Sequence, residues 1–222
     1  MFSARGANVF TETATDLDEY FAGARWYHFS GYTLLAQPQH DTAMSGLEIA
    51  RSHRCRSSLD PGLEPAMSYG KQIKQLLPKI DIFFPNEQEV IVLTQGKQIK
   101  DAVEELLDNG ARAIVVKRGG KGCIIAYDKK YYEIPAFDIQ VKDTTGAGDS
   151  FNAGIVLGRM VGLSWPASAV LGNALGAMTS SMKGSGAGSI TFRQVEELIS
   201  KDQFKPRWAQ WRGAMEEVLA WL

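Results

Sequence analysis

The segment VKDTTGAGDSF, residues 141–151, places two threonines and two glycines within the five positions before one carboxylate, Asp149. The residues after it have the apolar spacing of a helix, which therefore begins just before Asp149. At a helix start the first backbone amides have no partner inside the helix, and glycine lets a ligand approach the backbone closely. We therefore predict that the amides of Gly146, Ala147 and Gly148 form a cradle for an anion, aided by the helix dipole.

A carboxylate beside a bound phosphate is useful if it accepts a proton. In phosphoryl transfer to an alcohol, the attacking hydroxyl loses a proton and the transferred oxygens need positive stabilisation. Asp149 as general base and the cradle amides as donors meet these two needs. The alternative is a helix start without further function, because acidic first turns and a threonine cap such as Thr145 are common. Against this alternative, Gly148 stands where a capping box needs Glu or Gln.

The elements that must position this segment follow an alternating pattern. Between residues 25 and 117, the runs RWYHFS, CRSSLD, DIFF and ARAIVVK predict strands, and TAMSGLEIARSH, AMSYGKQIKQLL and AVEELLDNG predict helices. Such alternation predicts right-handed βαβ units and a mainly parallel sheet covered by helices. Further on, GCIIAYD and KYYEIPA predict two antiparallel strands joined through Asp128 and Lys129.

Two long helices are predicted around the candidate site, at about 148–161 and about 166–182, followed by the glycine-rich loop KGSGAGS and tryptophan-rich helices. The stretch from Val161 to Met182 has no charged residue and is about long enough to cross a bilayer. Its serines, asparagine, proline and three glycines favour a helix buried inside a protein instead. No internal repeat or low-complexity linker is visible, so we expect one domain.

The composition favours a globular protein with small-molecule partners. Of the 222 residues, 45% are hydrophobic, and the net charge is −1, which argues against nucleic acid or an anionic membrane as the partner. Cys55 and Cys123 lie in apolar contexts without the spacing of zinc ligands, and we expect buried thiols in a reducing cytoplasm. The acidic first residues of the chain predict no signal peptide.

The stretch DTTGAGDSFNAG resembles the second signature of the PfkB, or ribokinase-like, family of carbohydrate and nucleoside kinases. The resemblance implies a three-layer α/β/α fold with a mainly parallel sheet. It implies a transfer of phosphate from ATP to a hydroxyl group with the help of Mg²⁺. It also implies that Asp149 is the general base and that the cradle stabilises the transferred phosphoryl group.

Two further segments occur in the family's order. PNEQEV resembles its N-x-x-E motif, which implies that Asn86 and Glu89 organise Mg²⁺ and phosphate, mostly through water. By itself such a pair is more often a helix start. VVKRGGKGC resembles the strand and turn beside the nucleotide, which places Lys117, Gly119 and Gly122 near ATP. Taken alone it could be a tight hairpin turn, and it is not a Walker A loop because G-K-[ST] is absent.

Other positions match the family's nucleotide and cation sites. Asn173 matches the position that approaches adenine, although by itself it could be an ordinary buried polar residue, and the loop 183–189 matches a wall of the nucleotide site. Asp143 and Thr145 match positions that hold a monovalent cation in many members, with loop carbonyls completing the shell. The resemblance therefore makes K⁺ a candidate cofactor beside ATP and Mg²⁺.

The family's N-terminal portion has no counterpart in the chain. In the family that portion carries the first strands, the β lid over the sugar and most substrate contacts. Residues 1–222 are therefore expected to form the C-terminal, nucleotide-binding part of an N-terminally truncated kinase domain. Without the missing portion the sheet would expose an edge and apolar helix faces. Either the chain is a fragment of a full kinase, or a partner or a second copy, as in a homodimer, covers the gap.

The expected acceptor is a sugar or a related small molecule. FSGYTLL resembles the strand end at which family members contact the acceptor, and Ser30, Gly31 and Tyr32 favour a sugar acid such as 2-keto-3-deoxygluconate over a ribose-like sugar. Tyr32 could also be a core residue. Two rival interpretations stay open, namely a nucleotide-binding module without catalysis and a purely structural α/β domain.

Overall fold

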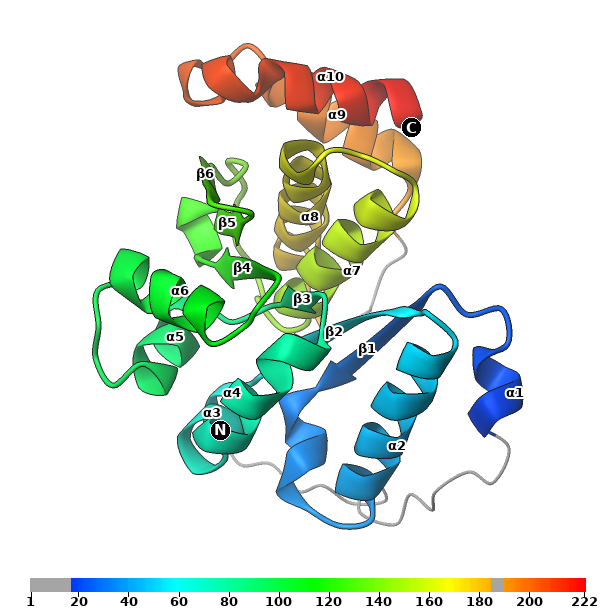
Figure 1. The fold of residues 1–222 in the computed structure, drawn as a ribbon. Coiled ribbons are helices and arrows are strands. Elements are labelled where there is room, and N and C mark those ends of the chain that lie inside the picture. Colours follow the sequence, from blue (N-terminus) through cyan, green and yellow to red (C-terminus); the bar gives the residue numbers. More distant parts are fainter. Residues whose placement is uncertain (1–16, 185–189) are drawn as a thin grey trace. The chain divides into compact units, whose positions relative to one another are not determined.

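The computed structural model describes residues 17–184 and 190–222 (Figure 1). Within these ranges six strands follow one another across a sheet in chain order, from β1 to β6. The chain divides into two compact units, one ending at Val115 and the other beginning at Val116, so the division falls inside strand β4 (Ala113–Lys117). The predicted succession of parallel strands followed by an antiparallel pair is confirmed.

The first unit is a parallel sheet with helical connections. Strands β1 (Trp26–Ser30), β2 (Arg56–Asp60) and β3 (Ile82–Phe83) run parallel, and β3 pairs with the start of β4. Figure 1 shows helix α2 lying along β1 and β2. The helical elements of this unit are α1 (Leu17–Phe21), η2 (Gly31–Leu35), α2 (Gln39–Ser52), α3 (Leu63–Ser68), α4 (Gly70–Leu76), η3 (Leu77–Lys79), α5 (Glu87–Leu93) and α6 (Ile99–Asp108).

The core of the first unit follows the strand register. Leu59, Phe83 and Ile114 are register partners on adjacent strands and are fully buried, so they form an apolar row across the sheet. The single helix predicted over AMSYGKQIKQLL is wrong in one respect, because α3 and α4 are separate helices that meet at Tyr69. Gly70, a poor helix former, stands where the second helix begins.

The second unit pairs a hairpin with long helices. Strands β5 (Cys123–Tyr127) and β6 (Lys130–Ile134) are antiparallel, and both turn residues between them have positive φ, as a tight hairpin requires. The prediction of a hairpin turned at Asp128 and Lys129 is confirmed. The helical elements are η4 (Gly119–Lys121), α7 (Ala147–Met160), α8 (Trp165–Ser180), α9 (Phe192–Asp202), η5 (Pro206–Trp211) and α10 (Arg212–Trp221).

Helices α7 and α8 pack through small residues, and Figure 1 shows them side by side. A Cβ atom added to Gly154 would lie 2.7 Å from the Cα of Gly172, and one added to Gly158 would lie 3.0 Å from the Cα of Ser168. The two backbones therefore approach as closely as glycine permits, which fixes the start of α7 against α8. The predicted buried helix is confirmed as α8. Within the described residues, no helix is long and apolar enough to span a membrane.

Candidate active site

Helix α7 begins without a side-chain cap. Its N-cap is Gly146, which has a left-handed φ of 77° that glycine adopts readily, and within the described residues no side chain forms a cap hydrogen bond at this helix start. Thr145 is therefore not the cap of this helix. The motif is therefore not explained as a helix start capped by threonine, and backbone donors at the start of α7 stay without a cap.

The cradle has a different set of donors from the one predicted. The Ala147 amide donates to the Thr144 carbonyl at 3.1 Å, so the prediction that it points outward unpaired is wrong. In the described part of the chain, the amides of Gly146, Gly148 and Asp149 donate to no protein acceptor. The Ala147 amide closes the tight turn that contains Gly146. The motif alone does not predict this hydrogen bond. The Asp149 amide is a donor that was not predicted, although its place in the first turn signals an unpaired donor.

Lys117 brings a positive charge to this helix start. It ends strand β4, and its Nζ lies 3.8 Å from the position that a Cβ on Gly148 would take. The Asp149 side chain is exposed on the same first turn. An ammonium group, unpaired amides and a carboxylate thus lie around one helix end, which is the set that a phosphoryl group and an attacking hydroxyl need.

The glycines after Lys117 shape the turn from β4 into β5. Gly122 is buried with a φ of 89°, and a Cβ there would lie 2.0 Å from the Ile134 carbonyl oxygen, so only glycine fits. Gly119 has a φ of 54° and faces open space. Close packing against Ile134 thus explains the glycine at position 122. The open surface at Gly119 is compatible with the predicted approach of a nucleotide.

Asp143 ties the segment before α7 to the end of α8. Its carboxylate accepts hydrogen bonds from the Thr145 amide at 2.9 Å and the Gly184 amide at 3.0 Å. The backbone and hydroxyl of Thr145, followed by the Gly184 amide, hold the pKa of Asp143 below its ordinary value. The predicted pair Asp143 and Thr145 is thus brought together. Gly184, from the loop expected beside this pair, contacts Asp143 through its amide and not through its carbonyl. Of the predicted wall 183–189, residues 185–189 lie outside the described residues.

Asn173 lies inside the second unit with its amide nitrogen engaged. The Nδ2 atom donates to the Pro135 carbonyl at 3.0 Å and to the Cys123 Sγ at 3.7 Å. Burial raises the pKa of the Cys123 thiol to about 12, so this sulfur is a neutral group. Both cysteines are free and buried, as predicted. The approach of Asn173 to adenine stays a prediction.

Asn86 and Glu89 lie in the first unit and form a capping box on α5. The Asn86 side chain accepts from the Glu89 amide at 2.9 Å, and the Glu89 carboxylate accepts from the Asn86 amide at 2.8 Å. The helix-start interpretation of this pair is therefore confirmed. Their role toward Mg²⁺ stays a prediction. In residues 17–184 and 190–222, no cluster of three or more His, Cys, Asp or Glu side chains could hold a metal by itself.

Known structures define the class of fold. The chain superposes on a putative ribokinase II from E. coli, solved in complex with ATP and Mg²⁺, with a TM-score of 0.76 at 22% identity, over 83% of this chain and 61% of that one. It superposes on the adenosine kinase of Sinorhizobium meliloti with a TM-score of 0.73 at 25% identity, over 78% of this chain and 54% of that one. The fold is therefore the ribokinase-like α/β/α fold that the sequence predicted.

The family follows from the sequence comparison. The model of the pfkB family of carbohydrate kinases matches residues 1–191, and the chain belongs to this family. It is 31% identical to the ribokinase of Haemophilus influenzae over 169 residues, which are 72% of this chain and 54% of the relative. It is 30% identical to fructokinase-1 of Zea mays over 210 residues, which are 85% of this chain and 63% of the relative. The chain spans less than two thirds of the length of these relatives.

Proposed function

We propose that the chain is the nucleotide-binding part of a kinase that transfers the terminal phosphate of ATP to a hydroxyl group of a sugar or related small molecule. The observation that carries the proposal is the uncapped start of α7, where unpaired amides, the Lys117 ammonium group and the exposed Asp149 carboxylate lie together. Membership of the pfkB family, whose relatives include named sugar and nucleoside kinases, supports it.

The proposed reaction assigns one task to each group. The Asp149 carboxylate accepts the proton of the acceptor hydroxyl as the oxygen of that hydroxyl forms a bond to the terminal phosphorus. The bond from that phosphorus to the bridging oxygen breaks, and ADP leaves with the electron pair. The amides of Gly146 and Gly148 and the Lys117 ammonium group offset the negative charge on the transferred oxygens.

The cofactors are part of the same proposal. The donor set suits ATP, since phosphate oxygens fit backbone amides at a helix start. The oxygen donors of Asn86 and Glu89 would hold Mg²⁺, mostly through water, and the ion would supply positive charge to offset that of the phosphates. K⁺ would lie beside Asp143 and Thr145, where a carboxylate already faces backbone groups.

The acceptor and the setting are finer parts of the proposal. Ser30 is the last residue of β1, and Gly31 and Tyr32 follow it, so the three residues lie at the strand end where ligands of open α/β sheets bind. Their types favour a sugar acid. Two buried free thiols agree with a reducing, cytoplasmic setting. A homodimer is the proposed assembly.

The test combines binding with turnover. Calorimetry of this chain with ATP and Mg²⁺ is set beside a coupled assay of ADP release with ribose, fructose, cytidine, adenosine and 2-keto-3-deoxygluconate. We expect saturable ATP binding by this chain, and turnover with at least one acceptor in a full-length form that includes the family's N-terminal portion. Binding without turnover favours the rival, a nucleotide-binding module without catalysis. If ATP does not bind, only the interpretation as a purely structural α/β domain remains.

The Asp149→Asn variant, made in a full-length form, tests the general base. It keeps the size of the side chain but removes the proton acceptor, so we expect turnover to fall by about a hundred-fold or more while ATP affinity stays within a few-fold. Ser150→Ala, at the next position of the same helix, is the control for local disturbance. Full turnover by the Asp149→Asn variant would refute the role of Asp149.

A further inference from the structure

The segment between β6 and α7, residues 135–146, has no regular secondary structure, yet it carries Asp143 and Gly146 of the candidate site. We call it the connector. Its distal half is held by the end of α8, where the Ser180 carbonyl accepts from the amides of Lys142 and Asp143 at 2.8 and 3.3 Å. An irregular segment of this length is costly in conformational entropy, so its position depends on such anchors.

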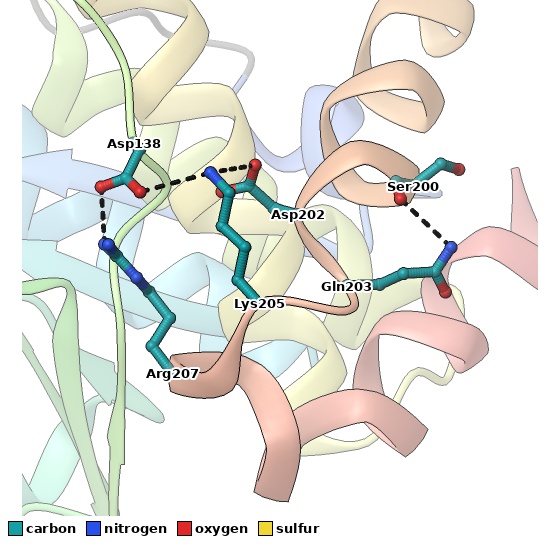
Figure 2. A network of polar contacts seen from close by, with 6 residues as sticks. All are labelled: Asp138, Ser200, Asp202, Gln203, Lys205 and Arg207. Carbon is teal, nitrogen blue, oxygen red and sulfur yellow. Dashed lines mark hydrogen bonds and ion pairs between the residues drawn. The ribbon is translucent and has the colours of Figure 1, made fainter.

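The proximal half of the connector is anchored by the C-terminal segment. The Phe137 ring packs on the fully buried Trp208 ring with centroids 4.6 Å apart. The Asp138 carboxylate forms ion pairs with Arg207 at 2.6 Å and with Lys205 at 3.2 Å. Figure 2 shows the Asp138 carboxylate between these two cations, with Lys205 reaching across to Asp202.

Lys205 is itself fixed by a buried carboxylate. Asp202 is 1% exposed and pairs with Lys205 at 2.7 Å, while its Oδ2 atom has no hydrogen-bond partner in the described structure. A buried carboxylate with one cationic partner holds that partner strongly, because separation would leave a charge unpaired in the interior. The Lys205 ammonium group is therefore held in place, and the half-exposed Asp138 forms an ion pair with it.

We propose that Asp138 is a positioning residue for the anion cradle, acting through its ion pairs with Arg207 and Lys205. The inference rests on the proposed function, since it assumes that the cradle binds nucleotide phosphate. Without the ion pairs of Asp138, which we call the anchor, the connector samples more conformations. Part of the binding free energy of the ligand is then spent on ordering the connector. Nucleotide affinity falls, although the fold, whose core does not include Asp138, stays intact.

The experiment measures the dissociation constant of ADP with Mg²⁺ by calorimetry for four variants of this chain. Asp138→Asn and Arg207→Gln each remove one charge of the anchor, and we expect each to weaken ADP binding by about two- to five-fold, as fits an exposed ion pair. Asp138→Glu keeps the carboxylate and should restore affinity to within about two-fold of the native chain. Lys205 is left intact, because its removal would strand the buried charge of Asp202.

The control is an ion pair of the same kind that does not touch the connector. Glu197→Gln breaks the exposed pair of Glu197 with Arg193 on α9 and should leave the dissociation constant unchanged. Thermal unfolding midpoints of all variants should agree within a few degrees. The proposal is overturned if Asp138→Asn binds ADP as tightly as the native chain, or if Asp138→Glu loses as much affinity as Asp138→Asn. If the native chain itself binds no nucleotide, the proposed function fails, and the positioning role fails with it.

Discussion

Asp143 shows how a single residue couples the candidate site to pH. Its carboxylate accepts from two backbone amides, so its pKa in the folded chain lies below the ordinary value of 3.8. The folded state therefore binds fewer protons at this residue than the unfolded chain does. Its stabilising contribution is complete above the unfolded pKa and is lost as the pH falls through the folded pKa.

The Asp143→Asn variant should reveal this dependence. Because the asparagine side chain does not titrate, the native chain should lose stability more steeply than the variant as the pH falls from about 4.5 to about 2.5. Urea denaturation at a series of pH values measures the difference. Parallel stability curves for the two proteins would contradict the assignment. Asp149→Asn, which removes another exposed carboxylate of the same site, is the matched control for the general effect of charge.

At the scale of the element, the start of α7 depends on the contact between α7 and α8. Four glycines, Gly154, Gly158, Gly172 and Gly176, allow this contact. A Cβ on Gly176 would lie 3.2 Å from the Ala147 carbonyl oxygen. The last contact is at the first residue of α7, beside the cradle. Helix packing therefore sets the place of the unpaired amides, which the helix alone could not do.

Gly154→Ala tests the helix contact. The added methyl group would lie 2.7 Å from the Gly172 Cα atom, which is backbone and cannot rotate away. We expect a loss of about 1–3 kcal/mol of unfolding free energy, as for overpacked cores, and weaker nucleotide binding. Gly213→Ala, on α10 with nothing within 4 Å of the new Cβ, should instead be neutral or stabilising. Equal stability of the Gly154→Ala variant and the native protein would refute the close contact.

At the scale of the whole molecule, the candidate groups of the cradle fall within one compact unit. Lys117, Asp143, Asn173 and the start of α7 belong to the unit that begins at Val116, whereas the capping box of α5 belongs to the other. Nucleotide phosphate bound at the cradle should therefore order the second unit most strongly.

Hydrogen exchange measures this distribution. With ADP present, amide exchange should slow at the unpaired donors Gly146, Gly148 and Asp149, while the interior of α2 in the first unit stays unchanged. The Asp138→Asn chain should show faster exchange at Lys142 and Asp143 without ligand. Protection confined to the first unit would place the nucleotide elsewhere and contradict the proposed site.

Much of the molecule could be predicted from local patterns. Alternating apolar runs indicated the strands and most helices, because the periods of strand and helix are properties of neighbouring residues. The break at Tyr69 between α3 and α4 was not predicted. A glycine inside a helical pattern, such as Gly70, weakens the helix but does not determine whether the helix ends there. The α5 capping box could be expected from Asn86 and Glu89 for the same local reason.

The candidate site divides in the same way. The sequence alone determined that a glycine-rich helix start with an acidic residue follows the hairpin, because the motif and its spacing are contained in a dozen neighbouring residues. Only the tertiary structure decided that Lys117 lies beside Gly148 and that Asp138 pairs with Arg207. These contacts depend on how separate elements pack against one another. The hydrophobic pattern along the chain indicates which faces are buried, but it does not indicate which side chains come into contact.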